Sequence, residues 1–179
     1  VGDRDDSNIY IKNKIKFGEE IGASVVYKKY PASIKEAELI GEIQKINTDP
    51  KVDGIIVQLP LPDNLSREKV IESIDPKKDV DGLTTSPLED SALVTPATAR
   101  GVLALLDFYK IEVQNKKVAV IGRSKLAGGP IAELLKERGG EVVVCHRGTE
   151  NIATICQESD VLVSAAGQAG LVTREFVKE

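Results

Sequence analysis

The sequence has little of what several kinds of catalysis require. Its 179 residues include one histidine, His146, and two cysteines, Cys145 and Cys156. Catalysis by a Ser–His or Cys–His pair must therefore use His146 or not occur. Two cysteines are too few for a disulfide framework and lack the spacing of a metal site, so we expect a reducing, cytoplasmic environment and no bound metal.

Two further absences bear on the partners of the protein. No apolar run approaches the length needed to cross a bilayer. The net charge of −4 does not indicate the basic surface that binds the phosphates of nucleic acids. We therefore expect neither a membrane nor a nucleic acid as a partner.

The chain also lacks an initiator methionine. It opens on Val1-Gly2-Asp3, which resembles the end of a strand, and it stops at Glu179 within a helix-like pattern. We expect part of the first domain to precede Val1 and part of the second to follow Glu179.

The most informative stretch is Asp-Gly-Ile-Ile-Val-Gln-Leu-Pro-Leu-Pro, residues 53–62. A short apolar run stopped by prolines predicts a buried parallel strand over 54–58, because proline cannot donate to a β-ladder. Gln58 then lies at the carboxyl end of this strand, where open α/β sheets bind ligands. Alternatively, Gln58 only closes the strand with a side-chain hydrogen bond.

Strand and helix patterns alternate around this stretch, which is typical of parallel α/β construction. The predicted core of the first helix is Ile11, Ile15, Phe17 and Ile21. The predicted elements are a helix over 8–20 capped by Ser7 and ended by Gly22, a strand over 24–28, a helix to 47 behind a Ser33–Glu36 capping box, and a helix to 74 capped by Ser66.

Tyr10 and Lys14 are spaced i, i+4 and therefore share one face of the first helix. A tyrosine beside a lysine can partly desolvate the ammonium group, which suits a functional lysine. Spacing alone strongly favours an ordinary solvated lysine.

The loop over 75–82 carries three aspartates, among them Asp79 and Asp81. Two aspartates this close suggest a calcium loop, but the glutamate that an EF-hand needs at a later position is missing. Asp81-Gly82 is also an ordinary turn sequence, so a plain structural role competes.

The second half predicts a Rossmann-like arrangement of strand, glycine loop, helix and strand. A polar loop over 83–94 leads into a helix to 109 that is capped by Thr98 and connects the two halves. The remaining predicted elements are strands over 117–121, 141–145 and 160–164, helices over 131–138 and 150–157, and a helix beginning at Thr173.

The loop after the first of these strands begins Gly122-Arg123-Ser124 and continues to a glycine pair at 128–129. Free backbone N–H groups at a helix start favour a phosphate group, although glycines there also serve tight packing. Arg147 follows the next strand at the position where an acidic residue would bind the ribose of NAD. An arginine there accommodates a 2′-phosphate, so NADP is favoured unless Arg123 and Arg147 are ordinary surface charges.

These motifs together resemble the bifunctional methylenetetrahydrofolate dehydrogenase/methenyltetrahydrofolate cyclohydrolase family over nearly the whole chain. The resemblance is carried by Tyr-x-x-x-Lys at 10–14, Gln-Leu-Pro-Leu-Pro at 58–62, Lys-Asp-Val-Asp-Gly at 78–82, Pro-Ala-Thr at 96–98, Val-Ile-Gly-Arg-Ser at 120–124 and Val-Cys-His at 144–146. The family's usual serine after His146 is replaced by Arg147, which strengthens the expectation of a 2′-phosphate.

The resemblance implies roles for four residues of the first domain. Lys14 is the central catalytic group, Tyr10 stacks on the folate ring system, Gln58 hydrogen-bonds the lysine, and Asp81 holds the pterin ring. In the second domain, Gly122, Arg123, Ser124 and Arg147 would bind NADP.

The resemblance also implies an architecture and an activity. It implies two α/β domains flanking a cleft, a folate-binding catalytic domain at 1–97 and a Rossmann-like NADP-binding domain at 98–179. The activity would be oxidation of 5,10-methylenetetrahydrofolate and hydrolysis of the methenyl product to 10-formyltetrahydrofolate, by a homodimer formed through the nucleotide domain.

Three alternatives remain open at this point. The first is a dehydrogenase with weak or no cyclohydrolase activity. The second is a catalytically silent module that binds folate and NADP. A shikimate-type dehydrogenase shares the two-domain plan but lacks the Gln-Leu-Pro-Leu-Pro stretch.

Overall fold

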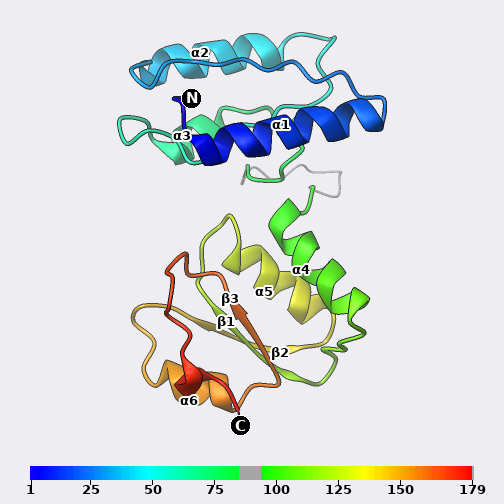
Figure 1. The fold of residues 1–179 in the computed structure, drawn as a ribbon, viewed down its shortest axis with the longest axis vertical. Coiled ribbons are helices and arrows are strands. Elements are labelled where there is room, and N and C mark those ends of the chain that lie inside the picture. Colours follow the sequence, from blue (N-terminus) through cyan, green and yellow to red (C-terminus); the bar gives the residue numbers. More distant parts are fainter. Residues whose placement is uncertain (85–93, 179) are drawn as a thin grey trace. The chain divides into compact units, whose positions relative to one another are not determined.

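The computed structural model describes residues 1–84 and 94–178. The chain divides into two compact units, Val1–Leu93 and Val94–Glu179, a few residues before the boundary expected at 97/98. Figure 1 shows the two units along the chain. The loop expected over 83–94 lies largely outside the described residues.

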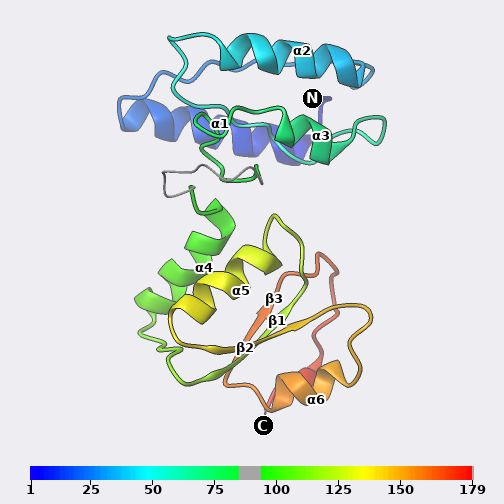
Figure 2. The same ribbon diagram turned by 180° about the vertical axis from the view of Figure 1, so that it is seen from behind.

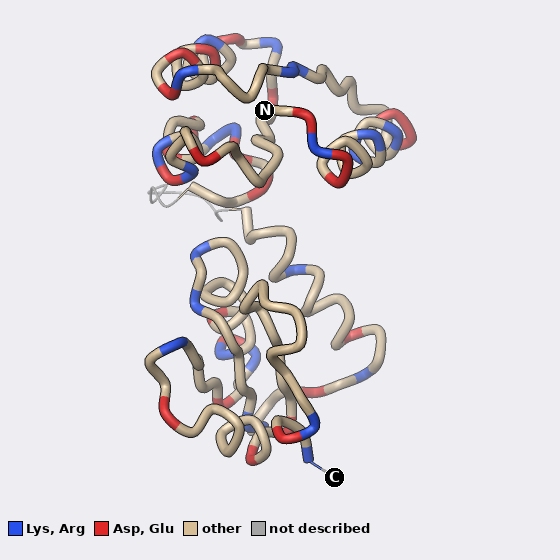
Figure 3. The backbone as a smooth tube through the Cα atoms, turned by 60° about the vertical axis from the view of Figure 1, so that its left-hand side comes forward, with Lys and Arg blue, Asp and Glu red and all other residues tan. Residues whose placement is uncertain are grey.

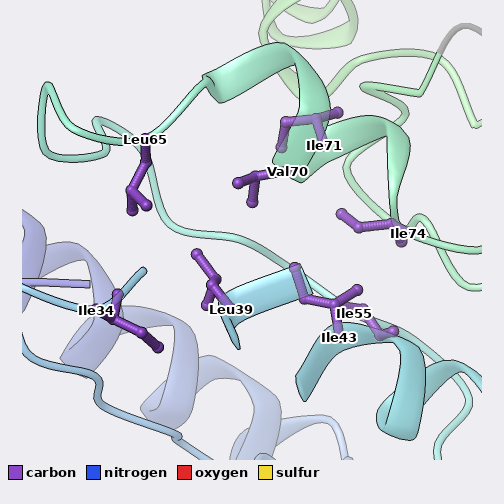
Figure 4. Packing of buried hydrophobic residues seen from close by; sticks show 8 residues of the cluster. All are labelled: Ile34, Leu39, Ile43, Ile55, Leu65, Val70, Ile71 and Ile74. Carbon is purple, nitrogen blue, oxygen red and sulfur yellow. The ribbon is translucent and has the colours of Figure 1, made fainter. Parts of the chain in front are cut away.

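In its described residues, 1–84, the first unit has the helices α1 (Asp5–Glu20), α2 (Glu36–Asn47) and α3 (Arg67–Glu72). Side chains from α2, α3 and the segments next to them meet in one hydrophobic core, shown in Figure 4. The buried members of this core are Ile34, Leu39, Ile43, Ile55, Leu65, Val70, Ile71 and Ile74.

No β-strand forms in the described residues of the first unit, so the strands predicted over 24–28 and 54–58 are wrong in extent. The second segment makes a single parallel bridge, between Ile55 and Asp79, and the Ile55 N–H donates to the Lys78 carbonyl at 2.7 Å. The ladder stops there because the N–H groups that follow turn onto the Asp79 carboxylate. The backbone of 24–28 hydrogen-bonds to no other backbone within the described residues.

Two of the three predicted helix caps in this unit are also wrong. α1 begins at Asp5, three residues earlier than expected, with Ser7 inside its first turn. Asp5 and Asp6 complement the positive end of the helix dipole there. Ser33 does not cap α2, because the helix begins at Glu36 with Lys35 at the N-cap position. The Glu36 carboxylate accepts the Ser66 N–H at 2.8 Å instead of completing a capping box.

Other features of the first unit follow the sequence more closely. Ser66 caps α3 as predicted, its hydroxyl oxygen accepting the Lys69 N–H, although α3 ends at Glu72 and not at 74. Gly22 ends α1 at a φ of +79°, as expected. Phe17 and Ile21 are 61% and 66% exposed, so the predicted core face of α1 is wrong at these two positions.

The second unit is built on three parallel strands in the order β2-β1-β3, namely β1 (Lys117–Ile121), β2 (Glu141–Cys145) and β3 (Val161–Ser164). The bounds of β1 and β2 are as predicted. The helices are α4 (Ala97–Phe108), α5 (Gly128–Glu137) and α6 (Ile152–Gln157), and a short 3₁₀ helix, η1 (Arg174–Phe176), stands where an α-helix was expected to begin.

Both faces of the central strand β1 are covered, as Figure 2 shows from behind. Val118 and Val120 pack with α4 and α5 on one face, whereas Ala119 and Ile121 pack with Cys145 and α6 on the other. Successive side chains of a strand alternate between its faces, so an uninterrupted apolar run indicates a strand buried on both sides.

Three helix starts differ from the prediction in this unit. α4 begins at Ala97 behind Pro96, so Thr98 is inside the helix and is not its cap. Pro96 suits this place because its fixed φ matches the approach to a helix. α5 begins at Gly128 and not at 131, and α6 begins at Ile152 and not at 150.

Candidate functional site

Gln58 presents a buried polar atom that nothing in the described residues satisfies. Its side-chain nitrogen Nε2 donates to the Leu59 carbonyl at 2.8 Å, while its oxygen Oε1 is buried without a partner. The Nε2 bond agrees with the simpler, structural interpretation of this residue. The unpaired Oε1 atom does not agree with that interpretation. Leaving a buried acceptor unpaired costs about 1–3 kcal/mol of folding free energy, so this position favours binding of a hydrogen-bond donor.

Asp81 lies on a turn that a second aspartate organises. The carboxylate of Asp79, which is only 4% exposed, accepts the N–H groups of Asp81 and Gly82 through Oδ1 and those of Leu83 and Thr84 through Oδ2. The four N–O distances run from 2.7 to 3.1 Å. The sequence analysis singled out Asp79 but missed this hydrogen-bonding role, because its partners are backbone groups, which leave no mark in the residue types.

Tyr10 and Lys14 lie on α1, one turn apart, as predicted. The Tyr10 side chain is 63% exposed, and Lys14 is partly buried. Figure 3 shows acidic and basic residues interspersed along this helix. The structure thus places Tyr10, Lys14, Gln58 and Asp81 in one unit, but no hydrogen bond joins any two of them within its described residues.

The carboxyl ends of the three strands in the second unit form one edge with two loops. The Gly122 N–H donates to the Cys145 carbonyl at 2.8 Å, and the Ala165 N–H donates to the Ile121 carbonyl at 2.7 Å. These bonds place the loop after β1 between the chain segments that follow β2 and β3.

The glycines of this loop are required by packing. Gly122 has a φ of +114°, and a Cβ atom there would lie 2.6 Å from the Ala165 carbonyl oxygen. A Cβ atom on Gly128 would overlap the Gly122 carbonyl oxygen. The alternative of a tight turn is therefore supported for both glycines, and any phosphate binding must come from the free backbone groups of the loop.

Such groups are present in the loop after β1. The N–H groups of Arg123, Ser124 and Lys125 donate to no acceptor in the described part of the chain, and all three side chains are exposed. Three successive free N–H groups and two cations before a helix N-terminus suit a phosphate group.

Arg147 lies on a tight turn directly after β2. The Thr149 hydroxyl accepts the His146 N–H at 2.9 Å, and Nδ1 of His146 accepts the Gly148 N–H at 3.1 Å. These bonds hold the turn and leave Arg147 exposed. Because β1 and β2 are neighbours in the sheet, Arg147 and Arg123 follow adjacent strand ends.

The two cysteines and the single histidine have structural surroundings. Cys145 and Cys156 are buried in the core beneath α6, and desolvation raises the pKa of both thiols. Nδ1 of His146 is occupied as an acceptor in its own turn. No cluster of three potential metal ligands occurs among residues 1–84 and 94–178. None of the helices described is both long and apolar enough to cross a membrane.

The parallel sheet, its glycine loop and the exposed arginines after two adjacent strands define the second unit as a Rossmann-like nucleotide-binding domain. Family models agree for both halves of the chain. Residues 1–81 match the tetrahydrofolate dehydrogenase/cyclohydrolase catalytic domain, and residues 96–179 match the NAD(P)-binding domain of the same family. The chain belongs to the tetrahydrofolate dehydrogenase/cyclohydrolase family.

Individual relatives support this assignment. The bifunctional protein FolD of Lactobacillus acidophilus is 41% identical over 183 residues, an alignment that covers all of this chain and 65% of the relative. A silkworm 5,10-methylenetetrahydrofolate dehydrogenase is 34% identical with a TM-score of 0.86, covering 99% of this chain and 67% of that one. The Trypanosoma brucei methylenetetrahydrofolate dehydrogenase-cyclohydrolase, solved with NADP and an inhibitor, is 35% identical with a TM-score of 0.88, covering 99% and 62%. This chain spans just under two thirds of the length of its curated relatives.

Proposed function

We propose that the protein carries out two consecutive reactions on one folate. The first is NADP-dependent oxidation of 5,10-methylenetetrahydrofolate to 5,10-methenyltetrahydrofolate, and the second is hydrolysis of that product to 10-formyltetrahydrofolate. Membership of the family supports both reactions. The observation that carries the proposal is the buried, unpaired Oε1 atom of Gln58 in the catalytic domain.

Lys14 is the donor that best fits this acceptor. An ammonium group carries three N–H donors and no acceptor, so it can pair with Oε1 of Gln58 and still reach a substrate or a water molecule. The methenyl carbon is cationic, so hydrolysis needs a positioned water and proton transfers around the tetrahedral adduct. A lysine held by an amide oxygen suits that general acid–base task.

Tyr10 and Asp81 supply binding and orientation. The exposed ring of Tyr10 offers an apolar face on which the folate ring system can stack. The Asp81 carboxylate can accept two parallel N–H groups from the amide-amine edge of a pterin. Holding the reacting carbon in one orientation lowers the entropic part of both barriers.

The second domain fits NADP by the chemistry of its donors. The free N–H groups of residues 123–125 suit the pyrophosphate, and the Arg147 guanidinium suits a 2′-phosphate. A bound nicotinamide ring would supply the hydride acceptor that the oxidation needs. The contribution of this chain is to bind and orient the dinucleotide.

Two assays test the proposal with the purified protein. Adding methylenetetrahydrofolate and NADP should raise the absorbance of NADPH, and adding methenyltetrahydrofolate alone should give hydrolysis above the buffer rate. Oxidation without hydrolysis would favour a dehydrogenase, which is how the silkworm relative is described. Binding of both ligands without either reaction would indicate a silent module and overturn the proposal.

We also propose that the protein is a cytoplasmic homodimer that associates through its nucleotide domain. This proposal rests on the family resemblance and, for the location, on the scarcity of cysteine. Light scattering on the eluting protein should give twice the chain mass of 19.3 kDa. A mass of one chain at micromolar concentration would rule out the dimer.

A further inference from the structure

The Asp79 carboxylate is the most heavily hydrogen-bonded side chain in the loop that carries Asp81. It accepts four successive N–H groups, from residues 81 to 84, and is almost fully buried. A carboxylate can bind four donors only through both oxygens, and here each oxygen takes two. The backbone at Asp81 is therefore fixed by a group two residues earlier in the chain.

Asp79 also joins this turn to the segment that leads to Gln58. It forms a parallel bridge with Ile55, three residues before Gln58. The approach is close, because a Cβ atom on Gly54 would lie 2.5 Å from Cγ1 of Val80. One residue thus touches both backbone segments that carry the polar groups assigned to folate binding.

The base of the loop is anchored to the end of α2. The Lys78 ammonium donates to the carbonyls of Ile46 and Asp49, at 3.2 and 2.6 Å. Oδ1 of Asn47 accepts the Asp75 N–H at 3.0 Å. Movement of the turn at Asp81 is thus opposed from both sides, by the anchored start of the loop and by the Asp79 carboxylate.

We propose that Asp79 is a positioning residue for folate, acting through the backbone of Asp81 to set the distance and direction of that carboxylate from Gln58. It does not touch the substrate. This inference rests on the proposed function, since it names the residue that orders the folate site. Its energetic basis is that charge-assisted hydrogen bonds to a buried carboxylate are short and strong.

Asp79→Asn tests the proposal because the amide replaces one oxygen by an N–H donor facing two N–H groups. We expect the KM for methenyltetrahydrofolate and the dissociation constant of tetrahydrofolate to rise about tenfold, the change that corresponds to one lost hydrogen bond. The dissociation constant of NADP should not change. Equal weakening of folate and NADP would show a general structural defect and overturn the proposal.

A double-mutant cycle separates positioning from structural support. If Asp79 acts through Asp81, Asp79→Asn should have little further effect on tetrahydrofolate binding in an Asp81→Asn background. Full additivity would overturn the proposal. Should Asp79→Asn fail to fold, Asp79→Glu keeps the charge but displaces the carboxylate by one methylene group, and the same cycle applies to it.

Glu36→Gln is the matched control. Glu36 also accepts a backbone N–H, from Ser66, and pairs with Lys69, but it joins α2 to α3 away from the loop. We expect this variant to lower thermal stability without changing the folate KM. A rise equal to that of Asp79→Asn would contradict the inference. Absence of folate binding in the unmodified protein would instead refute the proposed function.

Discussion

At the scale of single residues, the central question is which groups meet the folate. Tyr10, Lys14, Gln58 and Asp81 stay predicted site residues, and the structure adds one fact to each that sequence alone does not contain. The decisive one is the unpaired Oε1 of Gln58, which needs a donor. Lys14 is partly buried on α1 and has no hydrogen-bond partner among the described residues, so it is available for that role.

We expect Lys14→Ala to abolish hydrolysis of methenyltetrahydrofolate, lowering kcat by at least about 100-fold, as for loss of a general acid–base group. NADP affinity should stay unchanged because Lys14 belongs to the first unit. Stopped hydrolysis assays and a cofactor titration measure the two effects. Lys12→Ala, an exposed lysine on another face of α1, is the control, and unimpaired hydrolysis in Lys14→Ala would refute the assignment.

Arg147→Ala should weaken NADP more than NAD. The guanidinium is exposed beyond β2, where a 2′-phosphate would form charge-assisted bonds worth roughly 1.5–3 kcal/mol, or about 10- to 150-fold in affinity. Isothermal titration with both dinucleotides measures the difference. Lys136→Ala, at the carboxyl-terminal end of α5, should affect neither, and equal losses for NADP and NAD in Arg147→Ala would remove the 2′-phosphate role.

At the scale of elements, the strand β1, its glycine loop and α5 are closely packed against one another. β1 is buried on both faces, and the loop glycines are in contact with neighbouring backbone. The cofactor site therefore depends on close backbone packing as much as on charge.

Gly128→Ala should destabilise the second unit by about 1–3 kcal/mol, since the added methyl group overlaps the Gly122 carbonyl oxygen and the backbone must shift. The matched control is Gly101→Ala in α4, where nothing lies within 4 Å of the added atom. That variant should gain about 0.5–1 kcal/mol from the helix preference of alanine. Denaturant unfolding measures both, and an unaffected Gly128→Ala would show that the loop is not tightly packed.

At the scale of the whole molecule, the two units have separate hydrophobic cores. Leu39, on α2, belongs to one, and Leu135, on α5, belongs to another. Each unit therefore has its own source of stability, which is the expectation for chains with more than one domain.

Leu135→Ala should remove about 2–5 kcal/mol from the second unit, because the side chain is fully buried. Hydrogen–deuterium exchange should then lose protection in β1, β2 and β3 but not in α2. Leu39→Ala should give the reverse pattern. Loss of protection throughout the chain in either variant would show that the two cores unfold as one.

The sequence by itself determined the order of helices and strands in the second unit and the bounds of its first two strands. β1 and β2 have the predicted bounds, because a continuous apolar run flanked by glycine has few alternatives to a buried parallel strand. The family could also be predicted from the sequence. Its motifs, such as those at 58–62 and 78–82, are short stretches of consecutive residues, so they can be recognised without knowing the fold.

Only the tertiary structure decided how the first unit is held together. The strands expected at 24–28 and 54–58 do not form. A β-ladder needs a neighbouring strand to hydrogen-bond with, and the β-propensity of a segment does not show whether such a neighbour exists. The caps at Ser7, Ser33 and Thr98 failed because these helices begin at other residues, with no side-chain cap hydrogen bond at their starts. Glu36, the second residue of the expected capping box, instead accepts the Ser66 N–H. The carboxylate cage of Asp79 was invisible for the same reason, since backbone N–H groups are identical at every residue and only folding brings four of them to one side chain.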